Sequence, residues 1–393
     1  MTTATSSCRS ACRASPGMPG AWVATRLDVS DVRSWLRVSV DLPGGGIVLS
    51  GPNGAGKTSL VEALVLACLG VSCRTAREAE AVRTGAPALH VGLNLRGPKG
   101  SARREIGYAP RQGRRLSRDG QPVRSLSDWR ADGSVLVFLP EELRAVKGPP
   151  AARRRHLDRL LEAAMPGYGE DLAAYGAAIA QRNAALRSVR AGRTGVDAAT
   201  PWDMAAAQHG ARLVVARRAA MAHLAGPFAQ WLEALGGGPD GEIGLEPSPA
   251  ALAEVADEDV QAALRERMVA ARDREVAAGT TLAGPHRDDV FVGQRRGDGL
   301  VDLRRLGSQG EQRTAVLAML MAHRAHLAER AGLPILVLDD VLSELDPDRR
   351  GLLLDAVVGE GQCILTTADP AAAQAAAERG ARVLSVREGL LAA

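Results

Sequence analysis

GPNGAGKT, at residues 51–58, is the stretch of the chain that decides the fold. It matches the phosphate-binding loop pattern G-x-x-x-x-G-K-[ST] at every position. An apolar run at residues 47–49 precedes it, and a segment with helical spacing follows from residue 58 to about residue 69. Because a strand, a glycine-rich loop and a helix follow in this order, the stretch indicates a nucleotide site rather than a chance glycine-rich turn.

The residue types in this loop suit a bound ATP. Glycines let the backbone turn tightly so that several N–H groups point at the phosphates, and the start of the helix adds partial positive charge. We expect Lys57 to reach the β- and γ-phosphates and the Thr58 hydroxyl to ligate Mg²⁺. The predicted nucleotide-binding residues are Gly51, Pro52, Asn53, Gly54, Ala55, Gly56, Lys57, Thr58 and Ser59.

An acidic pair, Asp339 and Asp340, follows a second apolar run at residues 335–338. An apolar strand that ends in carboxylates can place one of them beside the metal of a phosphate-binding loop. We assign Asp339 to Mg²⁺, through water, and Asp340 to the attacking water as general base, with Lys57 as the second catalytic residue. Without the loop, the pair would indicate two solvated or helix-capping aspartates.

A third motif, SQGEQ at residues 308–312, opens a long predicted helix. Ser308 and Glu311 have the spacing of a capping box, so one interpretation is simply a well-capped helix. A serine and a glycine at a helix start also make an anion site. A fourth motif, SELD at residues 343–346, comes directly after the acidic pair.

The order of these four motifs resembles the head of ABC-type ATPases. The resemblance implies an α/β fold, an ABC-type ATPase head of the P-loop NTPase class with an inserted, mostly helical second domain. In such heads the serine motif of one copy closes on the γ-phosphate held by another copy, so ATP holds a homodimer together. The resemblance assigns this cross-protomer signature to Ser308, Gln309, Gly310, Glu311 and Gln312. It assigns the D-loop, which lies across the interface, to Ser343 and Asp346.

Changes of composition divide the chain. Residues 89–140 alternate like strands, residues 150–278 are rich in Ala, Leu and Arg with helical periodicity, and strand-like runs return after residue 279. We expect a disordered leader at 1–21, an N-terminal head part at 22–149, an inserted helical domain at 150–278 and a C-terminal head part at 279–393. The leader lacks the apolar core of a secretory signal.

Within the ABC superfamily the chain resembles the RecF family over nearly its whole length. The stretches that carry the resemblance include AGPHRDDV at residues 283–290, YGAAIAQRNAALR at 175–187 and the segment from SQGEQ through PILVLDDVLSELD. The resemblance implies a DNA repair and recombination protein whose heads dimerise with ATP and Mg²⁺ on duplex or gapped DNA. It also implies slow, DNA-stimulated hydrolysis and help, with RecO and RecR, in loading RecA.

Two other functions stay open from the sequence. One is the ATPase subunit of a membrane transporter, and the other is a scaffold that binds ATP without turnover. The position where transporter ATPases carry a switch histidine is Thr367 or Ala368, which disfavours the first and indicates slow hydrolysis. No apolar run is long enough to span a membrane, and the five irregularly spaced cysteines favour a reducing, cytoplasmic setting.

Candidate DNA contacts are arginine clusters, since the net charge of +4 permits nucleic-acid binding without demanding it. Arginine clusters suit phosphate contacts, although solvated arginines are an equal alternative. Aromatic residues make up only 3% of the chain, which argues against a base-stacking platform and favours binding to a duplex backbone. The candidates are Arg103, Arg104, Arg111, Arg114, Arg115, Arg153 and Arg154.

Overall fold

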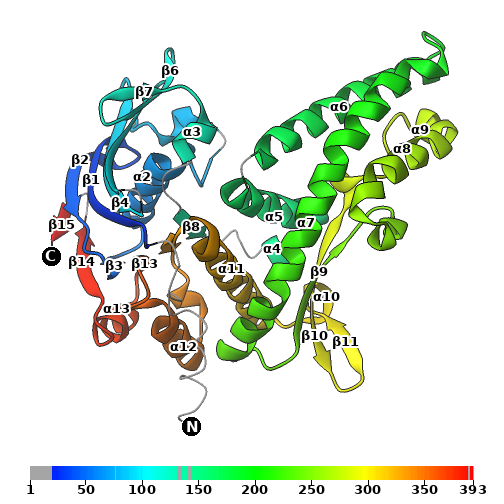
Figure 1. The fold of residues 1–393 in the computed structure, drawn as a ribbon. Helices are drawn as coiled ribbons and strands as arrows, with labels where there is room; N and C mark the ends of the chain where they lie inside the picture. The colour runs from blue at the N-terminus through cyan, green and yellow to red at the C-terminus, as the bar shows by residue number, and fades with distance from the viewer. Residues whose placement is uncertain are drawn as a thin grey trace. The chain divides into compact units, whose positions relative to one another are not determined.

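The computed structural model describes residues 20–75, 77–98, 100–130, 135–139, 144–165, 167–387 and 390–392. The chain forms two compact units, shown in Figure 1. The first comprises residues 1–142, 231–238 and 320–393, and the second comprises 143–230 and 239–319. The second unit therefore extends beyond the expected end at residue 278 and includes the serine motif. Residues 1–19 of the expected leader lie outside the described part.

A six-stranded sheet in the first unit carries the phosphate-binding loop. Its order is β15 (Leu390–Ala392), β14 (Arg382–Arg387), β3 (Gly46–Ser50), β13 (Cys363–Thr367), β12 (Ile335–Leu338) and β8 (Val135–Phe138). All neighbours except β14 and β15 pair in parallel. Apolar runs such as that of β12 are buried throughout, as expected for parallel strands covered on both faces. The carboxyl ends of β3, β13 and β12 consequently meet at one edge.

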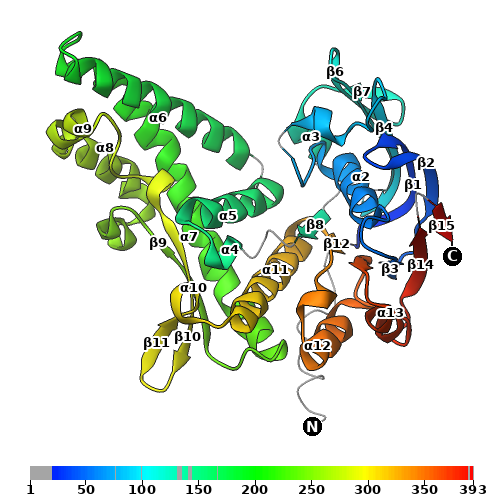
Figure 2. The same cartoon turned by 180° about the vertical axis from the view of Figure 1, so that it is seen from behind.

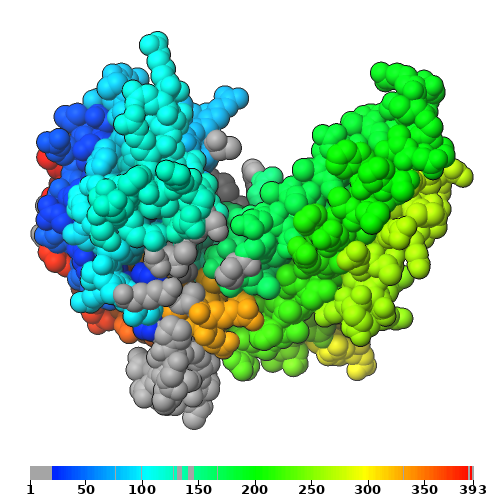
Figure 3. Space-filling model, turned by 45° about the horizontal axis from the view of Figure 1, so that its top comes forward, coloured from blue at the N-terminus to red at the C-terminus, as the bar shows by residue number. Residues whose placement is uncertain are grey.

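A second, antiparallel sheet lies beside it in the same unit. Its order is β2 (Trp35–Asp41), β1 (Val23–Val32), β4 (Leu89–Gly97), β5 (Gly100–Ala109), β6 (Gly113–Arg118) and β7 (Gln121–Val123). Helix α2 (Lys57–Leu69) contacts strands of both sheets and is buried almost all round, so the core of the unit forms around it (Figure 2). The outer strands of this sheet form the cyan surface in Figure 3.

Short helices complete the first unit. They are η1 (Glu78–Ala81), α3 (Leu126–Arg130), η7 (Leu342–Glu344), α12 (Pro347–Val357) and α13 (Pro370–Ala377). Helix α11 (Gln309–Ala331) begins in the second unit and ends in the first.

Helices dominate the second unit, as the periodicity predicts. They are α4 (Arg144–Lys147), α5 (Pro150–Ala164), α6 (Tyr168–Arg190), η3 (Val196–Ala199), α7 (Thr200–Ala234, of which the last turn lies in the first unit), η4 (Ala250–Glu254), η5 (Asp257–Asp259), α8 (Val260–Ala270), α9 (Arg272–Ala278), η6 (Pro285–Arg287) and α10 (Leu303–Leu306). The unit also holds a three-stranded sheet of β11 (Gly299–Asp302), β10 (Asp289–Arg296) and β9 (Gly241–Glu246). Strand β9 therefore lies within residues 150–278, the stretch that was expected to be helical.

A buried ion-pair cluster ties three helices of the second unit together. The guanidinium of Arg182 on α6 lies 2.7 Å from Asp203 on α7 and 2.6 Å from Glu275 on α9, and all three side chains are almost inaccessible to solvent. Arg182 also donates to the hydroxyl of Thr281 at 2.8 Å. Because a buried charge is tolerated only when it is paired, this cluster fixes how the helices pack.

Replacing Arg182 with methionine should lower the free energy of unfolding by about 3–5 kcal/mol, because it leaves buried carboxylates without their cation. Urea denaturation measures this change. Arg187→Met on the exposed face of α6 is the matched control and should cost less than about 0.5 kcal/mol. Equal stability of the two variants would show that the cluster contributes nothing.

Candidate nucleotide site

The phosphate-binding loop spans the gap between β3 and α2. Gly56 has φ of 103°, in the left-handed region that favours glycine, and a Cβ there would lie 2.8 Å from Nε1 of Trp35. The indole N–H of Trp35 donates to the Gly56 carbonyl at 3.0 Å. Lys57 Nζ donates to the carbonyls of Gly51 (2.7 Å) and Pro52 (2.9 Å), so the ammonium lies over the loop. Burial lowers the pKa of Lys57, and the nearby Asp340 and Asp339 oppose this.

The acidic pair follows β12 at the same edge of the sheet. Asp339 is buried, and its Oδ1 accepts hydrogen bonds from the hydroxyls of Thr58 (3.1 Å) and Thr366 (2.7 Å). Burial raises the pKa of Asp339, while these two hydrogen bonds lower it. The structure thus brings together Thr58 and Asp339, which the sequence places far apart. Thr366, on the intervening strand β13, was not predicted.

Asp340 and the SELD segment form a connected turn. Asp340 has φ of 52°, and its backbone N–H donates to the Thr366 hydroxyl at 2.9 Å. The Ser343 hydroxyl is 2.9 Å from the Asp340 carbonyl and 3.0 Å from its Oδ1. Asp346 caps α12 by accepting from the N–H of Arg349 at 3.0 Å. In one copy, therefore, Ser343 and Asp346 hold the turn that follows the acidic pair.

The serine motif opens α11 with the capping box that its spacing predicts. The Ser308 N–H donates to Glu311 Oε2 at 2.7 Å, and the Glu311 N–H donates to the Ser308 hydroxyl at 3.3 Å. Glu311 also pairs with Arg296 at 2.6 Å. The Gln312 amide donates to the carbonyl of Leu303 at 2.9 Å. The motif is therefore anchored inside the second unit.

Comparisons with known proteins agree with this arrangement. A family model described as an AAA domain matches residues 26–127. The DNA replication and repair protein RecF of Geobacter sulfurreducens is 39% identical over 327 residues, which cover 82% of this chain and 86% of that protein. The protein of the same name from Acidothermus cellulolyticus is 36% identical over 358 residues, or 88% and 93% of the two chains. The chain belongs to the RecF family.

Solved structures confirm the fold of this RecF-family chain. A structure of the recombination mediator protein RecF-ATPrS in the RecFOR pathway matches with a TM-score of 0.83 at 22% identity, over 96% of this chain and 99% of that one. The Smc head domain of Pyrococcus furiosus bound to the C-terminal domain of ScpA matches with a TM-score of 0.55 at 14% identity, over 94% and 95%. The predicted ABC-type head with a helical part is confirmed.

Family membership also decides between the functions left open by the sequence. The chain is an ATPase-type protein of a family named for DNA replication and repair, so the transporter interpretation is not retained. Among the residues that the structure describes, no helix has both the length and the hydrophobicity to cross a membrane.

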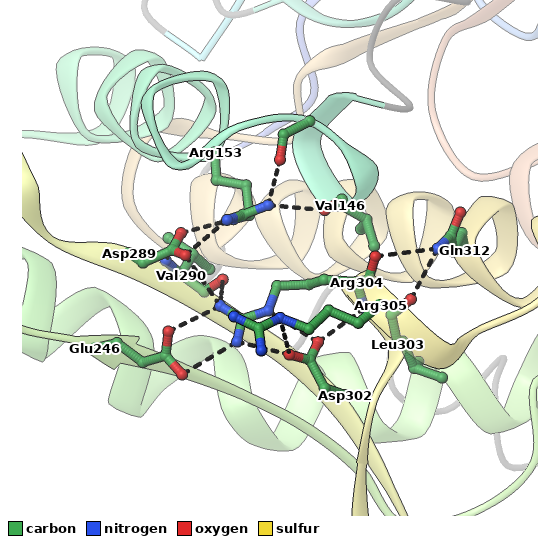
Figure 4. A network of polar contacts seen from close by, with 11 residues as sticks. Val146, Arg153, Glu246, Asp289, Val290, Asp302, Leu303, Arg304, Arg305 and Gln312 are labelled. Atoms are coloured by element: carbon green, nitrogen blue, oxygen red, sulfur yellow. Dashed lines mark hydrogen bonds and ion pairs between the residues drawn. The ribbon is translucent and has the colours of Figure 1, made fainter.

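Arg304 is the centre of a polar network behind the serine motif of the RecF-family chain (Figure 4). Its guanidinium bonds Glu246 at 2.8 and 3.1 Å, Asp302 at 2.9 Å and Asp289 at 3.2 Å. Its backbone carbonyl accepts from the Gln312 amide at 3.3 Å. These contacts connect the GPHRDD segment, through Asp289, to the start of α11. No local pattern predicts this role, because the partners of Arg304 come from four separate segments.

Two of the predicted DNA contacts need correction. Arg104 is fully buried, donates to the Cys68 carbonyl at 2.9 Å and lies 5.1 Å from the ring centroid of Trp129. Arg153 is also buried and forms a two-pronged pair with Asp289, both distances being 2.6 Å. Both side chains are held inside the fold, so neither can be a surface contact.

The other predicted DNA contacts are more accessible to solvent than Arg104 and Arg153, but not equally so. Arg103 is partly exposed but bonded to Asp28 and Glu105, and Arg114 is paired with Glu78. Arg111 and Arg115 are exposed on the antiparallel sheet and its turn, and Arg154 is half-buried in the second unit. Arg111 and Arg115 are thus the better placed of the first-unit candidates for a phosphate contact.

Thr366→Val should destabilise the protein by about 1–3 kcal/mol, since the buried hydroxyl serves both Asp339 and the Asp340 N–H. Turnover of ATP should fall about tenfold, because the Asp339 carboxylate and the Asp340 backbone each lose a positioning contact. Urea denaturation and phosphate release measure the two effects. Thr25→Val in β1, where the hydroxyl makes one 3.3 Å bond to the Asn94 carbonyl, is the control. Equal effects of the two changes would remove Thr366 from the site.

Proposed function

We propose that the chain binds ATP with Mg²⁺, that ATP closes two copies into a dimer, and that this dimer binds duplex or gapped DNA. Slow, DNA-stimulated hydrolysis releases the dimer. The observation that carries the proposal is the meeting of Thr58 and Asp339 beside Lys57, at the edge of the sheet where the phosphate-binding loop ends, in a chain of the RecF family.

The oxygen set at this edge fits a magnesium ion. Thr58 offers a hydroxyl and Asp339 a carboxylate, and Asp340 adds a second carboxylate nearby, which are hard oxygen ligands of the kind Mg²⁺ takes with phosphates. When bound, the ion would neutralise charge on the phosphates.

The chain's own residues have distinct roles in this proposal. Lys57 turns from the loop carbonyls to the β- and γ-phosphates, and the N–H groups of residues 51–59 surround them. Asp340 orients the attacking water and accepts its proton. The serine motif, residues 308–312, contacts the nucleotide of the second copy, and Ser343 and Asp346 lie at the interface between copies.

Slow turnover follows from the residue at the end of β13. Thr367 stands at or beside the position where a transporter ATPase has a histidine, and a threonine has no imidazole to contact the γ-phosphate. Its side chain is buried, and its hydroxyl accepts a hydrogen bond from the Asp369 N–H at 3.0 Å. A slow cycle suits a protein whose ATP-bound state must persist on DNA. Family resemblance extends the proposal to the cytoplasm, to single-strand gaps in duplex DNA and to help in loading RecA together with RecO and RecR.

Fluorescence anisotropy of a labelled gapped duplex tests the proposal. Affinity should be at least about tenfold higher with ATP–Mg²⁺ than with ADP–Mg²⁺, which is a difference of about 1.4 kcal/mol. Equal affinity in the two states would keep DNA binding and discard its control by ATP. Absence of binding in both states would leave only the ATPase head.

A further inference from the structure

The second unit holds a cavity that the nucleotide site does not use. It lies between α5, α6 and the turn η6, and Arg217 of α7 forms part of its lining. The cavity has a volume of about 390 Å³, within the range of about 300–1,000 Å³ that small-molecule sites occupy. Figures 1 and 2 show α5, α6 and α7 beside one another in this unit.

Positive charge is in excess around the cavity. Its lining includes four arginines but only two carboxylates, those of Asp158 and Glu162. Asp158 is already engaged, because it accepts from Arg217 at 2.8 Å and from the Tyr168 hydroxyl at 2.6 Å. Arg217 is fixed from behind by Asp288 at 2.9 Å. The four arginines are Arg154, Arg155, Arg159 and Arg217.

Arg154 is a cation of the lining whose guanidinium has room for a further partner. It is half-buried and donates to the Asp288 backbone carbonyl, and no carboxylate of the described residues forms an ion pair with it. Burial lowers the pKa of Arg154 and the charge of Arg217 lowers it further, whereas the carboxylates of Asp288, Asp289 and Asp158 act in the opposite direction. Arg155, one residue on, is exposed at the same rim. An anion between these side chains would offset both the burial and the repulsion.

The far wall of the cavity is neutral and partly apolar. The Tyr175 hydroxyl and His286 Nδ1 are 2.6 Å apart. Burial lowers the pKa of His286 to about 4, so the imidazole is uncharged at neutral pH. Ile179 and Leu172 of α6 add apolar surface. A charged rim above such a wall suits a ligand with one anionic end and a less polar body.

We propose that this cavity binds a phosphate group carried by a nucleotide, with Arg154 and Arg155 as its main ligands. Several arginines that line one cavity match a phosphate better than a carboxylate, because a phosphate offers more oxygens and more charge. The phosphate belongs either to the backbone of DNA or to a free nucleotide. The DNA source rests on the proposed function, whereas the free-nucleotide source does not.

The test compares Arg155→Glu with Arg193→Glu in the full chain, with ATP–Mg²⁺ present for the DNA probe and with the head saturated by ADP–Mg²⁺ for the nucleotide probe. Arg193 is exposed in the same unit, beyond the end of α6 and roughly 20 Å along that helix from Ile179. Two probes are used, a labelled 20-base-pair duplex followed by anisotropy at several salt concentrations and dAMP followed by calorimetry. ATP-induced dimerisation is recorded separately for each variant, so a failure of the head is distinguishable.

If the phosphate belongs to the DNA backbone, Arg155→Glu weakens duplex binding about tenfold and reduces the slope of affinity against salt by about one. Arg193→Glu then binds the duplex like wild type. If the phosphate belongs to a free nucleotide, duplex binding is the same in all three proteins. Wild type and Arg193→Glu then bind dAMP, and Arg155→Glu does not. If Arg155→Glu and Arg193→Glu behave alike with both probes, the cavity is not a phosphate site. Arg154→Gln, which keeps a hydrogen-bond donor, should repeat the Arg155→Glu result in weaker form.

Discussion

Asp340→Asn is expected to lower the ATP turnover number at least about 100-fold, the lower end of what a general base contributes. Asparagine has nearly the same shape but cannot accept the proton of the attacking water. The backbone turn should survive, because the Asp340 N–H bond to Thr366 and the bond from the Ser343 hydroxyl to the Asp340 carbonyl do not involve the replaced carboxylate. ATP affinity should therefore change less than about threefold, which corresponds to under 1 kcal/mol.

Phosphate release under saturating ATP and equilibrium binding of a fluorescent ATP analogue measure the two quantities. Asp348→Asn, an exposed position in the first turn of α12, is the control for loss of one negative charge. Unchanged turnover in Asp340→Asn would remove this residue from catalysis. The chain would then be better described as a scaffold that binds ATP without turnover.

Ser308→Arg is expected to abolish ATP-induced dimerisation and to leave the affinity of the monomer for ATP unchanged. The arginine places bulk and charge where the serine motif should meet the nucleotide of a second copy. The dimerisation constant should weaken at least about 100-fold, the loss expected for one central contact worth about 3 kcal/mol. Sedimentation velocity measures dimerisation, and fluorescence titration measures ATP binding.

Ser308 also caps α11, so the loss of the cap must be separated from the loss of the interface. Ser308→Ala removes the hydroxyl without adding bulk and should cost about 0.5–2 kcal/mol of stability. It should retain more of the dimerisation than Ser308→Arg. Normal ATP-induced dimerisation of Ser308→Arg would show that the serine motif does not act across protomers.

Local patterns in the sequence predicted the nucleotide loop and the acidic pair. The glycines of the loop, the apolar run of β12 and the capping-box spacing of residues 308–311 all act over a few residues, so one segment is enough to recognise each. The pairing of Thr58 with Asp339 could also be expected, because two parallel strands that end at one edge bring their following residues together.

Contacts between distant segments were not predictable from the same patterns. Thr366 looked like an ordinary strand residue, because its role depends on two contacts with a distant segment. Its hydroxyl donates to the Asp339 carboxylate and accepts from the Asp340 backbone N–H. Arg104 and Arg153 looked like surface cations because their partners are a carbonyl and an aromatic ring in one case and a distant carboxylate in the other. Strand β9 was missed for a related reason, since its partner β10 follows only after five intervening helical segments, η4, η5, α8, α9 and η6.

The most direct test of the central claim is sedimentation velocity of the protein with a labelled gapped duplex, in ATP–Mg²⁺ and in ADP–Mg²⁺. We expect the labelled DNA to sediment with two copies of the chain in ATP and to sediment mostly free in ADP. The same complex in both nucleotides, or a single copy on the DNA in ATP, would contradict an ATP-gated dimer that binds DNA.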